Sequence, residues 1–189
     1  MLPNLEGCVH LSVEGGCGGT TFGLQHARQV LSTGNHVIWV CNEMPDGNRF
    51  AQLYNEVSPA AVSRMHLIAI GDNLEQGIRS ATGLLNALNN IALVVVDDWT
   101  EKVGRASADA KAQIVQLSQT CTESNVPLLI ISSAYEDANQ KGWKARGNLN
   151  GFEIHFLHRS SVDTMIRELH NGDQVQQFIL GDEGFTPRK

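Results

Sequence analysis

Short apolar runs alternate with helix-length amphipathic segments over residues 9–133, and this alternation restricts the fold more than any other feature. Helix-type segments follow Thr21, ending near Gly34, and cover Arg49–Val57, Asn73–Asn89 and Ser107–Ser124. The strand-type runs between them are Val9–Val13, His36–Cys41, Met65–Ile70, Ile91–Asp97 and Val126–Ser133. Strands joined by crossover helices pair in parallel and are covered on both faces. The sequence therefore predicts an α/β fold with a mainly parallel sheet flanked by helices.

The pattern changes after Ser133, where strand-type runs follow one another without helices. These runs are Phe152–Leu157, Val162–Leu169 and Gln174–Leu180. The last two flank His170-Asn171-Gly172-Asp173, and Asn-Gly is a strong signal for a two-residue hairpin turn. We therefore expect an antiparallel β extension over residues 152–180, within a single domain that covers residues 1–189.

Composition and charge narrow the class of protein. The longest apolar runs, such as Ile91–Val96, are far shorter than the roughly 18–20 residues that cross a bilayer, and Met1–Leu5 does not resemble a secretory signal. The four cysteines are scattered without a Cys-x-x-Cys pair, which favours reduced thiols in a cytoplasmic protein. The formal charge of −6 means that any contact with DNA must rely on a local basic patch.

A glycine-rich segment lies between the first expected strand and the first expected helix, and reads Val13-Glu14-Gly15-Gly16-Cys17-Gly18-Gly19-Thr20-Thr21. In a phosphate-binding loop (Walker A, GxxxxGK[ST]), backbone N–H groups surround phosphate oxygens, a lysine reaches the outer phosphates and a hydroxyl holds magnesium. This segment contains no lysine. The candidate nucleotide-binding residues in it are Gly15, Gly16, Gly18, Gly19, Thr20 and Thr21.

Two alignments with that motif remain open. In one, Gly19 replaces the lysine, Val13 replaces the first glycine and Thr20 is the candidate magnesium ligand. In the other, Thr20 takes the lysine position and Thr21 faces magnesium. Both predict a degenerate loop that receives an anion through its backbone, with weakened or lost hydrolysis. The alternative is a glycine turn that only connects a strand to a helix.

Acidic residues follow two of the expected strands. Asp97 ends the Walker B-like strand 91–97 at the edge where open α/β sheets bind ligands, so it is a candidate for steadying Mg²⁺, and Asp98 could share that role. Glu43 follows the strand His36–Cys41 and could orient a water for attack on a γ-phosphate. The alternatives are an aspartate that caps the next segment and a solvated loop acid.

Together these segments resemble the RecA superfamily, and most closely the archaeal RadB branch of recombinase paralogues. Gly15–Gln25 resembles the first nucleotide motif with its helix, and Val37–Leu53 resembles the loop of the catalytic glutamate, which makes Glu43 the water-positioning candidate. Leu93–Asp97 resembles the second nucleotide motif. Leu128–Asp137 and Gly147–Lys189 resemble the strand before the second DNA loop and the closing β-strands.

The resemblance implies a RecA-like fold, ATP and Mg²⁺ as cofactors, and single-stranded DNA together with a RecA/RadA-type recombinase, or another copy of the chain, as partners. The departures weaken the nucleotide part, because the lysine and first glycine are absent and Ser133 stands where the family often has a glutamine. We therefore expect no efficient ATPase.

Two segments are candidates for contact with DNA, since the superfamily directs the loops after its fourth and fifth strands toward DNA. The first segment, 98–109, holds two basic residues and the second, 135–148, holds three with an indole; the residues are Lys102, Arg105, Lys141, Trp143, Lys144 and Arg146. Cations bind phosphates and an indole stacks on unpaired bases. The alternative is a solvated loop whose lysines confer solubility. The seven histidines show no metal-ligand spacing.

The leading hypothesis is a RadB-like accessory protein of DNA recombination and repair that binds DNA and, weakly or not at all, nucleotide. The alternatives are a catalytically inactive RecA-fold scaffold that acts through protein–protein contacts, and a slow ATPase that borrows a lysine from elsewhere, such as a neighbouring subunit.

Overall fold

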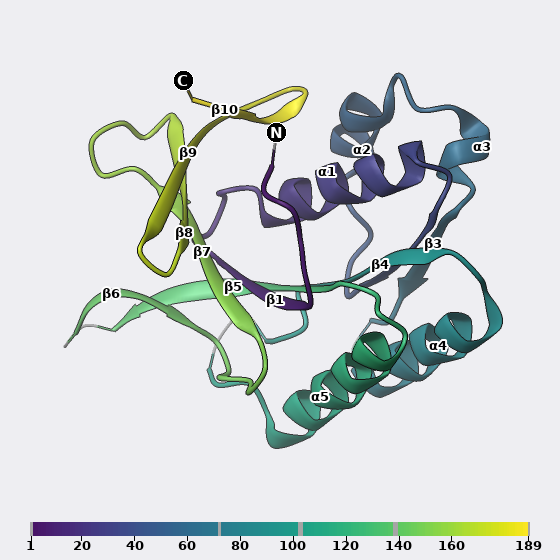
Figure 1. Ribbon diagram of the computed structural model, residues 1–189. Coiled ribbons are helices and arrows are strands. Elements are labelled where there is room, and N and C mark those ends of the chain that lie inside the picture. Colours follow the sequence, from purple (N-terminus) through teal and green to yellow (C-terminus); the bar gives the residue numbers. More distant parts are fainter. Residues whose placement is uncertain (1, 72, 102–103, 138–139, 189) are drawn as a thin grey trace.

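The computed structural model (Figure 1) describes residues 2–71, 73–101, 104–137 and 140–188. The helices are α1 (Gly19–Ser32), α2 (Gly47–Tyr54), α3 (Pro59–Val62), α4 (Leu74–Ala87) and α5 (Ala108–Glu123). The strands are β1 (Cys8–Val13), β2 (His36–Cys41), β3 (Met65–Ala69), β4 (Ile91–Asp97), β5 (Leu128–Asp137), β6 (Gln140–Ala145), β7 (Glu153–Arg159), β8 (Ile166–Asn171), β9 (Gln174–Gly181) and β10 (Gly184–Pro187).

The sheet has a parallel part and an antiparallel part. Its strand order is β10-β9-β8-β7-β1-β5-β4-β2-β3, and β6 pairs with the outer half of β5. The pairs from β3 to β7 are parallel, and β7 through β10 pair antiparallel. The predicted α/β fold with an antiparallel β extension at the C-terminus is confirmed.

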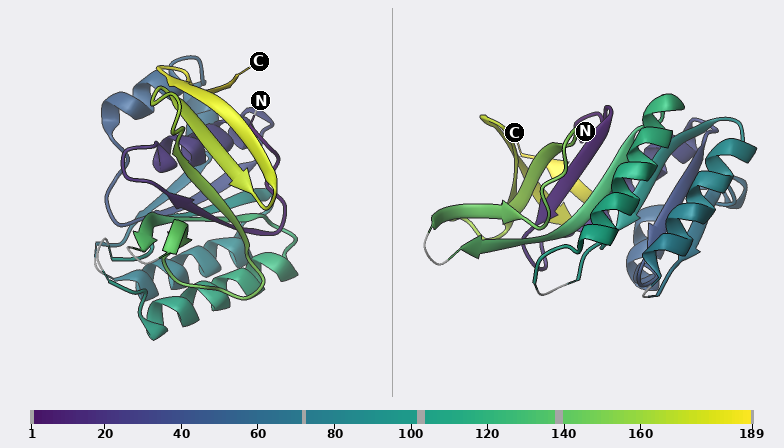
Figure 2. Two further views of the ribbon diagram at one scale, coloured as in Figure 1. Left: turned by 90° about the vertical axis from the view of Figure 1, so that its left-hand side faces the viewer. Right: turned by 90° about the horizontal axis from the view of Figure 1, so that it is seen from below.

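Helices cover both faces of the parallel part (Figures 1 and 2). On one face, α1 buries Phe22, Leu24 and Leu31 against the strands, and β8 to β10 curve over the same side. On the other face, α4 and α5 bury Ile78 and Ile114 against β2, β4 and β5. This two-sided burial explains why β2 and β4 are nearly continuous apolar runs. None of the helices in the described ranges is long and apolar enough to span a membrane.

The C-terminal half differs in detail from the sequence prediction. The hairpin between β8 and β9 does have a two-residue turn, but its residues are Gly172 and Asp173, because Asn171 still pairs with Gln174. Gly172 supplies the positive φ of 55° that this turn needs. Strand β8 begins at Ile166, so Val162 lies outside it with 94% of its surface exposed. The single-turn helix α3 and the strands β6 and β10 were not predicted.

Candidate nucleotide-binding site

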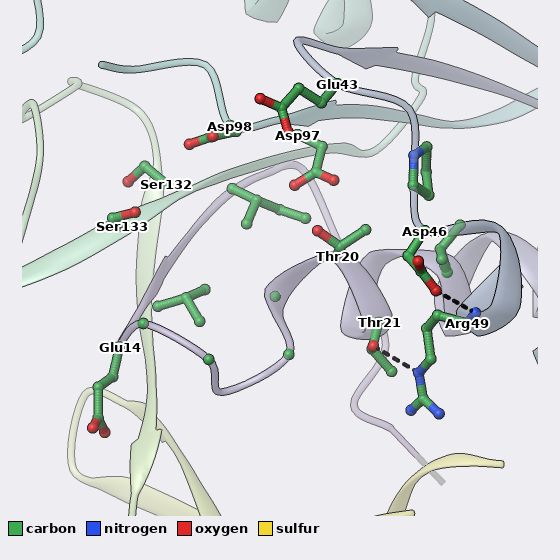
Figure 3. Close-up of a pocket in the computed structure, with 18 of the residues that line it drawn as sticks. Glu14, Thr20, Thr21, Glu43, Asp46, Arg49, Asp97, Asp98, Ser132 and Ser133 are labelled. Atoms are coloured by element: carbon green, nitrogen blue, oxygen red, sulfur yellow. Dashed lines mark hydrogen bonds between the residues drawn. The ribbon is translucent and has the colours of Figure 1, made fainter. Parts of the chain in front are cut away.

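A pocket of about 420 Å³ lies where β1, β4 and β5 end and α1 begins (Figure 3). The chain leaves β1 at Val13 and enters α1 at Gly19, passing through Gly18, whose φ of 92° only glycine adopts without strain. Free backbone N–H groups and the positive end of the helix dipole make the start of α1 suited to an anion. The sequence-predicted loop glycines, both threonines, Glu43, Asp97 and Asp98 all line this pocket.

Asp97 and Thr20 meet at the centre of the pocket. The Thr20 hydroxyl and the Asp97 carboxylate face each other in Figure 3. Burial, helped by the neighbouring Asp98, raises the pKa of Asp97 to about 6, although the Thr20 hydroxyl acts in the opposite direction. A hydroxyl beside a buried carboxylate is a donor set that suits Mg²⁺, which takes oxygen ligands and keeps several waters. Thr20 and Asp97 are therefore the residues that would hold this ion.

Thr21 points away from Thr20 and accepts a hydrogen bond of 3.0 Å from Nε of Arg49. Of the two threonines, Thr20 therefore lies beside Asp97, whereas Thr21 lies beside Arg49.

The carboxylates of Glu43 and Asp98 lie on the side of the pocket opposite the glycine loop (Figure 3). Glu43 is exposed, and follows β2 directly. Asp98 has a φ of 60°, an unusual conformation for a residue other than glycine. Such strained residues concentrate at functional sites, where the surrounding structure holds them in place.

Gly19 is tightly enclosed by apolar side chains. A Cβ atom at Gly19 would lie 2.9 Å from Cγ2 of Val13 and 3.0 Å from Cγ2 of Ile131. Contacts below 3.0 Å do not occur between unstrained carbons, so a side chain at position 19 requires Val13 or Ile131 to shift. Val13 and Gly19, at the two ends of the loop, are thus packed close to each other.

Two arginines lie beside the loop, and neither was singled out from the sequence. Arg49 lines the pocket from α2, while Arg159, at the end of β7, forms an ion pair with Glu14 and donates to the carbonyl of Gly15 at 3.0 Å. Nη2 of Arg159 would lie 2.9 Å from a Cβ atom at Gly16, so the guanidinium rests on the outer side of the loop. Arg159 is 145 residues from Glu14 in sequence, and only the β1–β7 pairing brings them together.

The guanidinium of Arg49 already donates hydrogen bonds to oxygen atoms of the protein. Besides Thr21, it donates to the carbonyls of Gly181 at 2.9 Å and Asp182 at 3.0 Å, and to the side chain of Gln52. Among the described residues that line the pocket, it carries the one positive charge, against five carboxylates. The five are Glu14, Glu43, Asp46, Asp97 and Asp98.

The far wall of the pocket comes from β5. Ser133 lines it, and Oγ of Ser132 lies 2.7 Å from Nε2 of His10. Burial lowers the pKa of His10 to about 4, so its ring is neutral near pH 7. The rings of His10 and Trp99, the residue after Asp98, form a T-shaped pair with centroids 5.7 Å apart.

The second candidate DNA segment is largely a hairpin. Residues 135–137 continue β5 and residues 140–145 form β6, which together extend beyond the body of the molecule (Figure 2). The indole of Trp143 stacks on His158, with ring centroids 5.9 Å apart. Lys144 pairs with Tyr135 across the hairpin.

Arg146 joins the two candidate DNA segments. It donates to the carbonyl of Gly104 at 2.6 Å, and its guanidinium lies 5.5 Å from the ring centre of Tyr135. Arg105 is exposed beside this contact. Lys102 and the side chain of Lys141 lie outside the described parts of the structure.

Comparisons with known proteins identify the fold. Neither a scan against protein-family models nor a search of curated proteins found a match. Among solved structures, the RadB recombinase matches with a TM-score of 0.77 and 20% identity, over 98% of this chain and 93% of that one. A DnaB-like replicative helicase, solved in a study of its interactions with primase, matches with a TM-score of 0.67 and 14% identity, over 95% of this chain and 57% of that one. This chain therefore has the RecA-like α/β fold.

Proposed function

We propose that this protein is a RadB-like accessory factor of DNA recombination and repair, which binds DNA and holds a magnesium nucleotide weakly, with slow or absent hydrolysis. The observation that carries the nucleotide part is the contact between Val13 and Gly19. A lysine at position 19 would need the space that the valine side chain fills. The loop has thus lost its lysine together with the room for one.

The charges around the pocket support weak binding that depends on magnesium. The lining carboxylates Glu43, Asp97 and Asp98 repel phosphates, while Arg49 is held by oxygens of α1 and the β9–β10 turn. The start of α1 still offers its N–H groups to an anion. A divalent ion at Thr20 and Asp97 would reverse the local charge, so the nucleotide is expected to bind with Mg²⁺ and not alone.

The DNA part of the proposal rests on the β5–β6 hairpin. Lys144 and Trp143 lie on β6, and Arg146 follows it, so cations and an indole occupy one projecting element. Such a combination binds single-stranded nucleic acid through phosphate contacts and base stacking. The shared fold with the RadB recombinase is consistent with this role.

The second candidate function is an inactive RecA-fold scaffold that works through protein–protein contacts alone. The net charge of −6 favours it, because it opposes association with a polyanion. The two candidates differ in one measurable property, namely salt-dependent binding of single-stranded DNA.

Fluorescence anisotropy of labelled single-stranded DNA, at two salt concentrations and with or without Mg-ATP, separates these functions. The test variant is Lys141→Ala/Lys144→Ala/Arg146→Ala. The matched control, Arg28→Ala/Arg79→Ala/Lys111→Ala, removes the same charge from helices α1, α4 and α5.

The accessory role predicts salt-sensitive binding that the hairpin variant loses and the helix variant retains. Equal losses in both variants would mean that only net charge matters, and would contradict a hairpin site. No binding near physiological salt at tens of micromolar protein would remove the DNA role and leave the scaffold.

A further inference from the structure

His158, Glu168 and His170 form a cluster on the antiparallel part of the sheet. One ligand atom from each, a ring nitrogen or a carboxylate oxygen, lies within 4.8 Å of the other two. The sequence gives no hint of this cluster, because ten residues separate its first two members. The strand register creates it: His158 pairs directly with Glu168 across β7 and β8, and His170 follows on the same face of β8.

The three side chains are half-buried and supported by neighbours. Oε1 of Glu168 accepts a hydrogen bond of 2.9 Å from Gln177 on β9, and Oε2 lies 3.4 Å from Nε2 of His170. The side chain of Glu168 is 17% exposed and that of His170 is 34% exposed. Solvent can therefore reach the cluster, while the carboxylate is kept in one orientation.

His158 is oriented as a metal-binding histidine usually is. Its Nδ1 lies 2.8 Å from the carbonyl of Arg159, and donation to that oxygen leaves Nε2 with a free lone pair. Histidines that bind metals commonly give their second N–H to a backbone carbonyl in this way. The indole of Trp143 lies beside this imidazole, with the two ring centroids 5.9 Å apart.

We propose that His158, Glu168 and His170 bind a divalent transition-metal ion, with Zn²⁺ as the occupant. Two imidazoles and one carboxylate suit zinc, whose bonds of about 2.0–2.2 Å require the three ligand atoms to close in by roughly 1 Å. Small side-chain rotations supply this movement. Three protein ligands leave a fourth position for water or an anion. The site is independent of the proposed nucleotide and DNA functions, although Trp143 places it against the β5–β6 hairpin.

Zinc affinity of the untagged, chelator-treated protein tests this proposal, measured by competition with a chromophoric chelator. We expect one equivalent to bind, and His158→Ala, Glu168→Gln and His170→Ala each to weaken binding at least tenfold. His66→Ala is the matched control, because His36 and His66 form the other close pair, with ring nitrogens 2.9 Å apart. Circular dichroism in EDTA confirms that each variant is folded, and Glu168→Gln preserves shape most closely.

Trp143 provides a second readout that is specific for this site. Cu²⁺ or Co²⁺ at His158 lies beside the indole and should quench its fluorescence, and Trp143→Phe should abolish that quenching without changing affinity. Zinc binding that survives all three ligand variants, or that is lost equally in His66→Ala, would overturn the proposal. Failure to bind one equivalent of Zn²⁺ in competition with the chelator would also overturn it.

Discussion

The glycine-loop pocket and the β5–β6 hairpin are held in place by different forces. The pocket lies at the end of strands buried on both faces, and tight apolar contacts such as Val13 with Gly19 determine its shape. The hairpin extends from the body and is held by ring contacts and hydrogen bonds of half-buried side chains. Substitutions in the pocket should therefore affect stability, whereas those in the hairpin should mainly affect binding.

The largest stability effect is expected from packing at the loop. Gly19→Ala should lower the free energy of unfolding by about 2 kcal/mol, since the new methyl group overlaps Val13 and Ile131. In a double-mutant cycle, Val13→Ala/Gly19→Ala should cost about 1 kcal/mol less than the sum of its two single changes. Urea denaturation measures all three variants.

Gly15→Ala is the matched control for this cycle, because a Cβ atom there has no neighbour within 4 Å. It should be nearly neutral. If Gly19→Ala were equally neutral, or if the two changes were strictly additive, the packing explanation for the missing lysine would be wrong.

The free energy of unfolding should also depend on pH, because a histidine is buried in the main body of the protein. Burial, with a smaller contribution from His155, lowers the pKa of His26 to about 4, compared with about 6.5 in the unfolded chain. Between these pH values the unfolded state binds more protons than the folded state does. The contribution of His26 to the free energy of unfolding is therefore fully present above about pH 6.5 and is lost as the pH drops toward 4. His26→Leu should reduce this dependence by about 1 kcal/mol per pH unit. Urea midpoints between pH 5 and 7.5 that give the wild-type slope in the variant would contradict this.

A smaller effect is expected where the pocket meets the C-terminal strands. Arg49→Ala removes the hydrogen bonds to Thr21, Gly181 and Asp182, and should destabilise the protein by about 1 kcal/mol through loosening of the β9–β10 turn. Arg28→Ala is the control, since its ion pair with Glu56 is 3.8 Å long and largely exposed, and should change stability by less than about 0.5 kcal/mol. Thermal or urea unfolding would detect the difference. Similar values for the two variants would show that Arg49 does not anchor the turn.

The smallest stability effect is expected in the hairpin. Trp143→Ala should lower the free energy of unfolding by only about 0.5 kcal/mol, since it removes one ring contact of a half-buried side chain. Its affinity for single-stranded DNA should nevertheless fall about tenfold, through lost stacking. A large stability loss with unchanged DNA binding would reverse the proposed contrast between the two regions.

The parallel half of the fold was predictable because its strands are buried on both faces. The bounds of β2 and β4 match the predicted runs, and α4 and α5 lie within two residues of theirs. Strand β6 was missed because its sequence, Gln140–Ala145, is polar and forms only by pairing with β5.

The site was predictable only in part. Local motifs pointed to the glycine loop, Asp97 and Glu43, which all line the pocket. The ion pair of Glu14 with Arg159, and the clustering of His158 with Glu168, depend on strand register and leave no local signal. Likewise, the different neighbours of Thr20 and Thr21 depend on the packing of α1 against β4 and α2, and leave no local signal.

Calorimetric titration of Mg-ATP into the wild type and loop variants distinguishes a weakened nucleotide site from an active one. We expect weak wild-type binding that requires Mg²⁺, no gain in Gly19→Lys alone because Val13 fills the space, and at least tenfold tighter binding in Val13→Gly/Gly19→Lys. Tight wild-type binding with steady hydrolysis that Glu43→Gln abolishes would instead identify an active ATPase.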